Sequence, residues 1–233
     1  TTAFIFIDFN VSDSISDVTL QATCPEPNLM FLRAVLDEFD DDFNSILKKE
    51  IENLLANFNG IIVVDEAYID FSAQPSWVKR LSEFPNLIIL QTLSKAWASA
   101  GIRLGMAFAS EAIIALFNKV KYPYNVNILT QKHALSILSN KSEVDLWIKT
   151  LMEERGKMQK ELANLSIVEK LYPTDANFIL AKVKDADKTY QHLVSKGIIV
   201  RNRNTVVLCG NCLRITIGTP EENEILLKEL KAF

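Results

Sequence analysis

Two short stretches of uninterrupted apolar residues most restrict the folds open to this chain. Residues 61–64 read Ile-Ile-Val-Val and lead directly into Asp65, and residues 87–90 form a second stretch of the same kind. Continuous apolar strands are typical of parallel sheets that are buried on both faces. Residues 45–58, before the first stretch, carry apolar residues at helical spacing, with Ser45 in the N-cap position. A helix, a buried strand and a carboxylate at the strand's carboxyl end together predict an α/β fold with a largely parallel sheet.

The remaining pattern predicts two domains. Short strands are expected at 4–7 and 29–32, and a long amphipathic helix at 143–165 contains the expected boundary. Residues 1–145 then form a partial large domain, in which 1–44 are hard to assign, and residues 146–233 form a small α+β domain. The other expected elements are strands at 104–109, 167–171, 178–183, 198–201 and 213–217, and helices at 111–119, 126–138, 186–195 and 220–230.

Composition excludes some classes of partner. The chain has 233 residues, of which 48% are hydrophobic, and its formal net charge is -4, so neither nucleic acid nor an anionic membrane is expected to bind. No apolar run approaches the roughly 20 residues that span a bilayer, and the first residues lack the basic start of a signal peptide. The odd cysteine count, from Cys24, Cys209 and Cys212, fits a reducing cytosol, which predicts a cytoplasmic protein. The single C-x-x-C spacing is weak evidence for metal binding, and no metal site is predicted.

A lysine between hydroxyl residues follows the second apolar stretch. Lys95 lies close to Thr92 and Ser94, and Arg103 follows eight positions later. An amine near apolar groups and another cation has a lowered pKa and can form a Schiff base with a carbonyl. Hydroxyls and a guanidinium are suitable phosphate ligands. Pyridoxal phosphate requires both an imine-forming amine and an anion site, although a lone Ser-Lys pair is more often a surface turn.

A second group of residues surrounds Asp65. A carboxylate at the end of a buried strand requires a partner, and the protonated nitrogen of a pyridine ring is a suitable one. Tyr68 lies three residues further on, where its phenol can reach the oxygen of such a ring. The simpler interpretation is that Asp65 caps the turn that follows the strand.

Together these groups resemble the fold-type I pyridoxal-phosphate aminotransferases and, more narrowly, the histidinol-phosphate aminotransferase family within them. The resemblance rests on ordered blocks across residues 45–233, each weaker alone than the set. The blocks are residues 65–68 with Phe71, residues 92–95, 100–105, 123–127, 176–180 and 213–222.

The resemblance implies roles for the cofactor-binding residues. Lys95 would hold the cofactor as an imine and carry the proton during catalysis. Asp65 would pair with the pyridine nitrogen, and Tyr68 would donate to the ring oxygen. The remaining residues would hold the cofactor phosphate, and they are Thr92, Ser94 and Arg103.

The resemblance also implies substrate-binding residues. Arg214 would bind the substrate carboxylate or phosphate, and Arg201 would lie near the substrate phosphate. Asn177 is expected at the substrate or domain interface, and Tyr124 and Asn125 would line the substrate side. The implied reaction converts histidinol phosphate and 2-oxoglutarate to imidazole acetol phosphate and glutamate, in histidine biosynthesis. The amino donor and the 2-oxo acid acceptor are thus the expected small-molecule partners, and the implied assembly is a homodimer.

The N-terminal part departs from the family. Residues 1–28 match none of its motifs, and the expected strand 29–32 leads into Arg33 and an acidic stretch where the family has an Asn-Pro-Thr-Gly loop. Asn44 is therefore not assigned a cofactor contact. Two interpretations follow, either that the sequence omits segments of a longer enzyme or that it is a fragment with an incomplete site.

Three alternatives remain open. One is another aminotransferase or a decarboxylase of the same fold, acting for example on aromatic amino acids. A second is a truncated, non-catalytic relative that binds a ligand or partner without turnover. A third is a hydrolase that uses Thr92 and Lys95 as a nucleophile and base, but the accompanying motifs of such enzymes are missing from the sequence.

Overall fold

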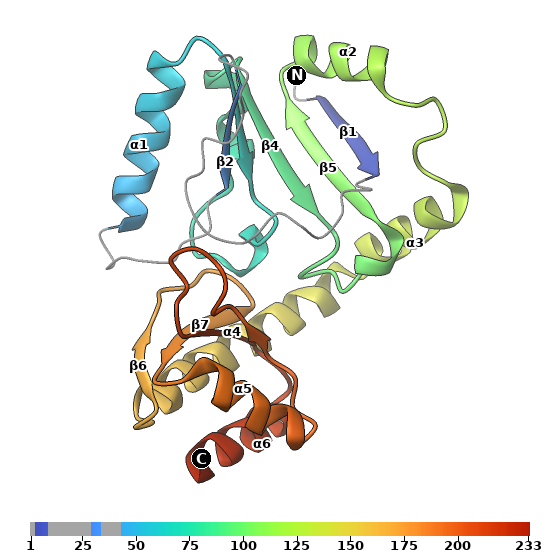
Figure 1. The fold of residues 1–233 in the computed structure, drawn as a ribbon. Helices are drawn as coiled ribbons and strands as arrows, with labels where there is room; N and C mark the ends of the chain where they lie inside the picture. Colours follow the sequence, from blue (N-terminus) through green and yellow to red (C-terminus); the bar gives the residue numbers. More distant parts are fainter. Residues whose placement is uncertain (1–2, 9–28, 34–42) are drawn as a thin grey trace. The chain divides into compact units, whose positions relative to one another are not determined.

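The computed structural model describes residues 3–8, 29–33 and 43–233 and divides into two units, each with its own sheet (Figure 1). The first unit contains the described residues up to Val144, and the second runs from Asp145 to Phe233. This division and the expected boundary after residue 145 both fall in helix α4 (Lys141–Ala163). Assigning the units to a large cofactor-binding domain and a small domain stays a prediction. The expectations for Cys24 and for the acidic stretch 34–42 concern residues outside the described ranges.

The first unit is built on a mixed sheet. Strands β2, β3 and β4 run parallel, β5 is antiparallel to β4, and β1 is antiparallel to β5. Asp65, the last residue of β3, pairs with Leu90 of β4, so the carboxyl ends of these two neighbouring strands meet at one edge. The described strands, in spatial order, are β1 (Ala3–Asp8), β5 (Leu104–Ala109), β4 (Leu87–Thr92), β3 (Ile61–Asp65) and β2 (Leu29–Arg33).

Different helices cover the two faces of this sheet, because successive side chains of a strand point to opposite faces. Ile62 packs in one cluster with side chains of helix α1 (Phe43–Asn57) and of the 3-10 helix η2 (Trp77–Glu83). Val63 packs in another cluster with side chains of helix α2 (Glu111–Val120). The uninterrupted apolar run of β3 therefore reflects burial on both sides, as the sequence predicted.

Three predicted helix starts in this unit are wrong, and one of them is that of α4, which begins at Lys141 and not at residue 143. Helix α1 begins at Phe43, so Ser45 lies inside it and is not the N-cap. Helix α3 (Ile128–Ser139) begins two residues later than expected, because the Asn127 side chain accepts a hydrogen bond from the Thr130 backbone N–H at 3.0 Å and caps it. The two short 3-10 helices η1 (Ile69–Phe71) and η3 (Ala100–Ile102) complete the segments around the strand ends.

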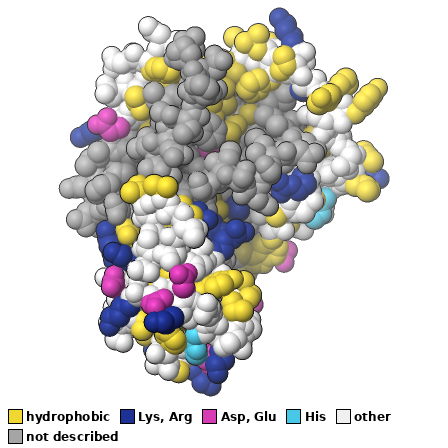
Figure 2. Space-filling view, viewed as in Figure 1, with side chains coloured by type: hydrophobic (Ala, Val, Ile, Leu, Met, Phe, Trp, Pro, Cys, Tyr) yellow, Lys and Arg dark blue, Asp and Glu magenta, His cyan; other side chains and the backbone are white. Residues whose placement is uncertain are grey.

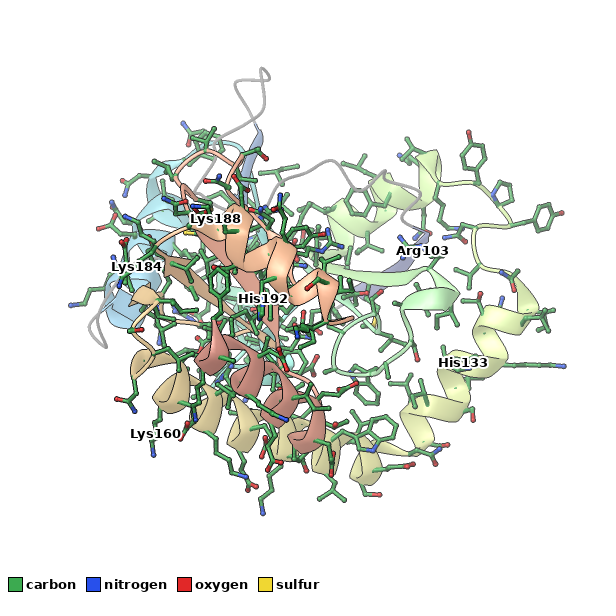
Figure 3. All side chains as sticks on the ribbon, turned by 60° about the horizontal axis from the view of Figure 1, so that its bottom comes forward. Arg103, His133, Lys160, Lys184, Lys188 and His192 are labelled. Carbon is green, nitrogen blue, oxygen red and sulfur yellow. The ribbon has the colours of Figure 1, made fainter. Side chains whose placement is uncertain are left out.

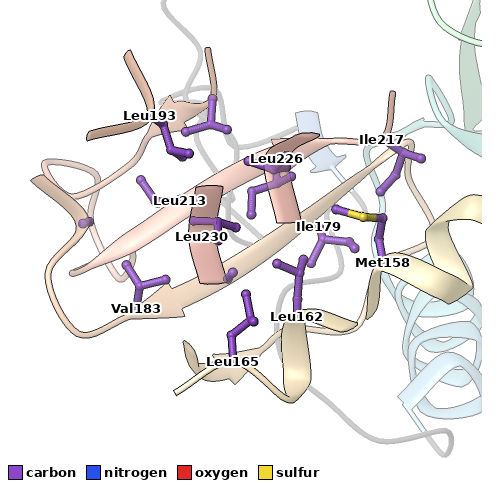
Figure 4. Close-up of a cluster of buried hydrophobic side chains, with 14 residues drawn as sticks. Met158, Leu162, Leu165, Ile179, Val183, Leu193, Leu213, Ile217, Leu226 and Leu230 are labelled. Carbon is purple, nitrogen blue, oxygen red and sulfur yellow. The ribbon is translucent and has the colours of Figure 1, made fainter. Parts of the chain in front are cut away.

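The second unit packs helices against an antiparallel sheet of order β6-β7-β9-β8. Its core joins Ile179 and Leu213 of the sheet to Met158, Leu162 and Leu226 of the helices (Figure 4). Burial of these apolar side chains is the main source of stability for the unit. Besides most of α4, its elements are β6 (Val168–Leu171), β7 (Phe178–Val183), α5 (Ala186–Ser195), β8 (Arg201–Asn202), β9 (Cys212–Thr216) and α6 (Pro220–Ala232).

Strand β8 is shorter than the predicted strand at 198–201, and the end of helix α5 explains the difference. Gly197 has a positive φ of 76°, and the Ile198 backbone N–H donates to the Leu193 carbonyl at 2.9 Å. A glycine in this conformation terminates a helix by turning the following residues back onto its last carbonyls. Residue 198 is thus part of the helix end, and pairing with β9 begins only at Arg201.

A buried amide ties α6 to α4 within the second unit. Asn223 Nδ2 donates to Glu154 Oε2 and to the Gly218 carbonyl, both at 3.1 Å, and its Oδ1 accepts from the Gly218 N–H at 3.0 Å. Hydrogen bonds from Lys157 and Asn223 lower the pKa of the Glu154 carboxyl, so it accepts these bonds as an anion at neutral pH.

We expect Asn223→Ala to lower the free energy of unfolding by about 2–4 kcal/mol, because it leaves a buried carboxylate and a buried peptide group without these bonds. Urea unfolding followed by circular dichroism measures the effect. Glu224→Ala, at the exposed neighbouring position of α6, is the control and should change stability by less than about 0.5 kcal/mol. Equal effects of the two substitutions would contradict the prediction.

Two further findings apply to residues 3–8, 29–33 and 43–233. Within these ranges no helix is long and apolar enough to span a bilayer. The same residues contain no group of three or more His, Cys, Asp or Glu side chains arranged to hold a metal ion. Cys209 and Cys212, whose spacing was noted in the sequence, are buried thiols on either side of a tight turn.

Candidate active site

Asp65 ends β3 and is partly buried at the carboxyl edge of the parallel strands. Its Oδ1 accepts a hydrogen bond from the Ala67 backbone N–H at 3.0 Å, which is the turn-capping contact foreseen as the simpler interpretation. A carboxylate has two oxygens and about four acceptor positions, so this bond orients the side chain without using its whole capacity. Capping the turn and pairing with a cation are therefore compatible.

Thr92 and Ser94 form a compact hydroxyl pair after β4. Their side-chain oxygens lie 2.8 Å apart, and the Ser94 backbone N–H donates to Thr92 Oγ1 at 3.0 Å. The Thr92 hydroxyl also lies 3.1 Å from the carbonyl of Leu104 at the start of β5. Both hydroxyls are thus held at the edge where β3 and β4 end, one strand away from Asp65.

Lys95 and Tyr68 come together although they are far apart in the sequence. Lys95 is exposed, and its Nζ lies 5.2 Å from the centroid of the Tyr68 ring, within the range of a cation–π contact. Lys95 follows β4 and Tyr68 follows β3, so the contact joins the segments that leave two neighbouring strand ends. The side chains of Lys95 and Tyr68, which were identified from separate parts of the sequence, thus lie together at one edge of the sheet.

The lysine segment has a strained backbone. Ala98 and Arg103 both adopt the left-handed conformation, with φ of 50° and 54°, which costs a residue with a Cβ atom on the order of 1 kcal/mol. The exposed Arg103 side chain donates from Nη1 to the Ala100 carbonyl at 3.2 Å. Strain of this kind concentrates at functional sites, and here it lies on both sides of a short turn that follows Lys95.

Ser99 fixes this segment and was not singled out in the sequence. It is 4% exposed, its N–H donates to the Leu93 carbonyl at 3.0 Å, and its hydroxyl donates to the Trp97 carbonyl at 2.8 Å. Its Oγ also lies 3.0 Å from Nε2 of His133 on helix α3. Figure 3 shows Arg103 and His133 on neighbouring elements of the first unit.

Glu66 is a second residue that the sequence did not mark as functional. Its side chain is 7% exposed and accepts hydrogen bonds from Ser76, Trp77 and Gln91. The only local signal was a carboxylate next to Asp65 at the end of a buried strand. The donors lie 10 to 25 residues away in the sequence, so spacing gave no sign of them.

Two predicted substrate residues are cross-strand neighbours in the second unit. Arg201 of β8 lies directly opposite Arg214 of β9, so the two side chains leave the same face of the sheet. Like charges in this position destabilise a strand pair, and a bound anion would remove that repulsion. Arg201 is exposed, while the Arg214 guanidinium lies 4.9 Å from the centroid of the Phe178 ring. The structure therefore brings the two predicted arginines together on one face of the sheet.

The other predicted substrate residues are less constrained. Asn177 is partly buried just before β7, and its backbone carbonyl accepts from the Ile217 N–H at 3.0 Å. Asn125 is partly buried, whereas Tyr124, on the segment between α2 and α3, is 96% exposed. A lining role for Tyr124 therefore requires a ligand or another chain that covers it.

The sequence model of the family described as aminotransferase class I and II matches residues 46–230. The chain belongs to this family. Among curated aminotransferases, the histidinol-phosphate aminotransferase of Bacteroides thetaiotaomicron is 49% identical over 229 residues, which are 98% of this chain and 65% of that protein. The corresponding enzyme of Flavobacterium johnsoniae is 54% identical over 188 residues, 81% of this chain and 54% of that protein. The chain thus spans about half to two thirds of these relatives' length.

Solved aminotransferase structures share the fold. The histidinol-phosphate aminotransferase of Clostridium acetobutylicum superposes with a TM-score of 0.75 at 22% identity, covering 88% of this chain and 63% of that one. The enzyme of Sinorhizobium meliloti, solved in complex with pyridoxal-5'-phosphate, gives a TM-score of 0.68 at 19% identity, covering 88% and 56%. The predicted α/β aminotransferase fold class is confirmed, with a sheet that is parallel from β2 to β4 and antiparallel beyond.

Proposed function

We propose that this chain is a pyridoxal-phosphate-dependent aminotransferase that takes histidinol phosphate as amino donor and 2-oxoglutarate as acceptor. The observation that carries the proposal is the Lys95 amine beside the Tyr68 ring, at the sheet edge that also bears Asp65 and the Thr92 hydroxyl. The products would be imidazole acetol phosphate and glutamate. Relatives of that name at about 50% identity support the choice of substrate.

The residues at this edge fit the cofactor. The hydroxyls of Thr92 and Ser94, together with the guanidinium of Arg103, would hold its phosphate, because they supply directed hydrogen bonds and positive charge. Asp65 would pair with the pyridine nitrogen, and the Tyr68 phenol would donate to the ring oxygen. When bound, the cofactor supplies an electron-withdrawing ring that makes the proton on the substrate's α-carbon more acidic.

The chain's own residues would move the proton and orient the substrate. Lys95 Nζ would take the proton from the α-carbon as a general base and return it as a general acid, a role that requires the neutral amine first. Asp65, held by the Ala67 N–H, would keep its charge in a fixed position through both steps. We assign cofactor binding to the first unit and recognition of the substrate anion to Arg201 and Arg214 of the second.

The proposal is tested by adding histidinol phosphate and 2-oxoglutarate to cofactor-loaded protein and measuring glutamate formation. Phenylalanine serves as a competing donor, and buffer without a donor is the blank. Turnover with histidinol phosphate at least tenfold faster than with phenylalanine supports the proposal. Faster turnover with phenylalanine would point instead to an aromatic aminotransferase, and no turnover with either donor would indicate a non-catalytic relative.

We expect removal of either arginine to weaken binding of the phosphorylated donor. Because charge-assisted hydrogen bonds contribute about 1.5–3 kcal/mol each, Arg201→Ala and Arg214→Ala should each raise KM for histidinol phosphate by about 10–100-fold. Steady-state kinetics at fixed 2-oxoglutarate measure the change. Lys182→Ala removes a cation of β7, in the same sheet, and should leave KM within twofold. An unchanged KM in both arginine variants would refute the assignment.

We also propose that the protein works as a homodimer in the cytoplasm, without a nucleic-acid or membrane partner. The support for the homodimer is an array of exposed apolar side chains along α2, α3 and the segment between them, part of which Figure 2 shows. Exposed apolar patches of this kind are typical of protein interfaces. A second copy over this surface would also cover Tyr124. The exposed residues are Leu116, Val120, Tyr122, Ile128, Leu129, Leu135 and Leu138.

A further inference from the structure

Glu66 joins three separate segments of the first unit. Its Oε2 accepts from the Ser76 hydroxyl at 2.6 Å and from Gln91 Nε2 at 2.9 Å, and its Oε1 accepts from the Trp77 backbone N–H at 2.7 Å. Gln91 Nε2 also lies 3.2 Å from the Ser76 oxygen, which closes the network. A carboxylate that accepts three hydrogen bonds while almost fully buried is held in one position, because charged acceptors bond about twice as strongly as neutral ones.

The segments that Glu66 joins are those that carry the candidate site. Glu66 directly follows Asp65, and Gln91 directly precedes Thr92, so the bond between them links the ends of β3 and β4. Ser76 and Trp77 begin helix η2. The intervening residues 67–75, which include Tyr68, are therefore fastened at both ends by one side chain.

We propose that Glu66 is a positioning residue, which sets Asp65 and Tyr68 relative to Thr92 and Lys95. This inference rests on the proposed function, because it is the bound cofactor that would require both strand ends at fixed separation. Glu66 itself is assigned no contact with cofactor or substrate. Its effect is transmitted through the peptide bond to Asp65 on one side and through Gln91 to Thr92 on the other.

The test uses Glu66→Gln, which keeps the size of the side chain but presents an NH₂ donor to groups that are themselves donors. We expect the apparent Kd for pyridoxal phosphate, measured by quenching of tryptophan fluorescence, to rise about tenfold. The midpoint at which the visible band of the lysine-bound cofactor changes with pH should move by at least half a pH unit. In turnover, kcat should fall more than KM rises, because geometry at the reacting atoms is lost.

The exchange variant Glu66→Gln with Gln91→Glu swaps the two side chains, so that an amide at residue 66 donates to a carboxylate at residue 91. It should recover at least half of the lost cofactor affinity and bring the spectral midpoint back towards the wild-type value. Glu83→Gln, at the far end of η2, is the control for loss of a negative charge and should behave as wild type. Failure of the exchange variant to recover either property would overturn the proposal.

The outcomes separate this inference from the function on which it rests. If the wild-type protein binds no cofactor, the proposed function fails. If the wild type binds cofactor and Glu66→Gln matches it within twofold in affinity and spectrum, the function stands and the positioning role fails. Should Glu66→Gln not fold, Gln91→Met removes only the link to β4 and should raise the apparent Kd about threefold, and an unchanged Kd there would overturn the proposal.

Discussion

Lys95→Ala is expected to abolish transamination and to prevent covalent attachment of the cofactor. The substitution removes both the amine that would bind the cofactor and the group that would move the proton. Because general acid–base catalysis alone contributes about 10²–10⁴-fold, the rate of glutamate formation should fall by at least that factor. Borohydride reduction of the loaded wild type, followed by peptide mass spectrometry, should locate the cofactor on residue 95.

The matched control for this experiment is Lys119→Ala, which removes an exposed lysine at the end of α2. It should retain wild-type activity and the same labelled peptide. Two results would refute the assignment of Lys95. One is a Lys95→Ala protein that keeps more than a tenth of the activity, and the other is a wild-type label found on a different lysine.

Asp65→Asn should reduce kcat by about 10²–10³-fold while the protein remains folded. Asparagine keeps an Oδ1 acceptor, so the 3.0 Å bond from the Ala67 N–H and the turn it caps are expected to survive. The negative charge is lost, however, and breaking a buried charge pair costs about 3–5 kcal/mol. Steady-state kinetics measure the loss of rate, and circular dichroism checks the fold.

Asp145→Asn, an exposed position in α4, controls for a general effect of losing one carboxylate. Its kcat should equal that of the wild type. If Asp65→Asn is equally active, Asp65 serves only as a turn cap, and a different group must stabilise the charge on the cofactor ring. Unfolding of Asp65→Asn would mean that the hydrogen bond from Ala67 requires a charged acceptor. We expect no unfolding, because asparagine offers an amide oxygen in the same position.

The strands that carry the candidate site were predictable because of their burial. Four apolar residues in succession are typical of a strand that is covered on both faces, and α1, η2 and α2 cover β3 in this way. The direction of β5 was not predicted. The segment between Thr92 and Leu104 contains only the short helix η3, and a parallel return usually requires a longer crossover with an α-helix. The chain therefore comes back antiparallel.

Contacts between distant residues were beyond the sequence pattern. The partners of Glu66 lie in η2 and β4, and which donor meets which oxygen depends on how those elements pack. The direct opposition of Arg201 and Arg214 depends on strand register, which in turn depends on where β8 begins after the end of α5. The family resemblance predicted a role for both arginines. Only the strand register of β8 and β9 shows that their side chains lie on the same face of the sheet.

The backbones of Asp65 and Thr92 are held in strand pairs, opposite Leu90 and Gly105 respectively, whereas residues 72–75 and 121–125 lie outside these pairs. Mutations in these two outer segments would leave the backbones of Asp65 and Thr92 in place. Substitutions in such surface segments could therefore change which substrate is accepted without displacing the reacting groups. Directed evolution of this chain should accordingly begin with libraries in residues 72–75 and 121–125.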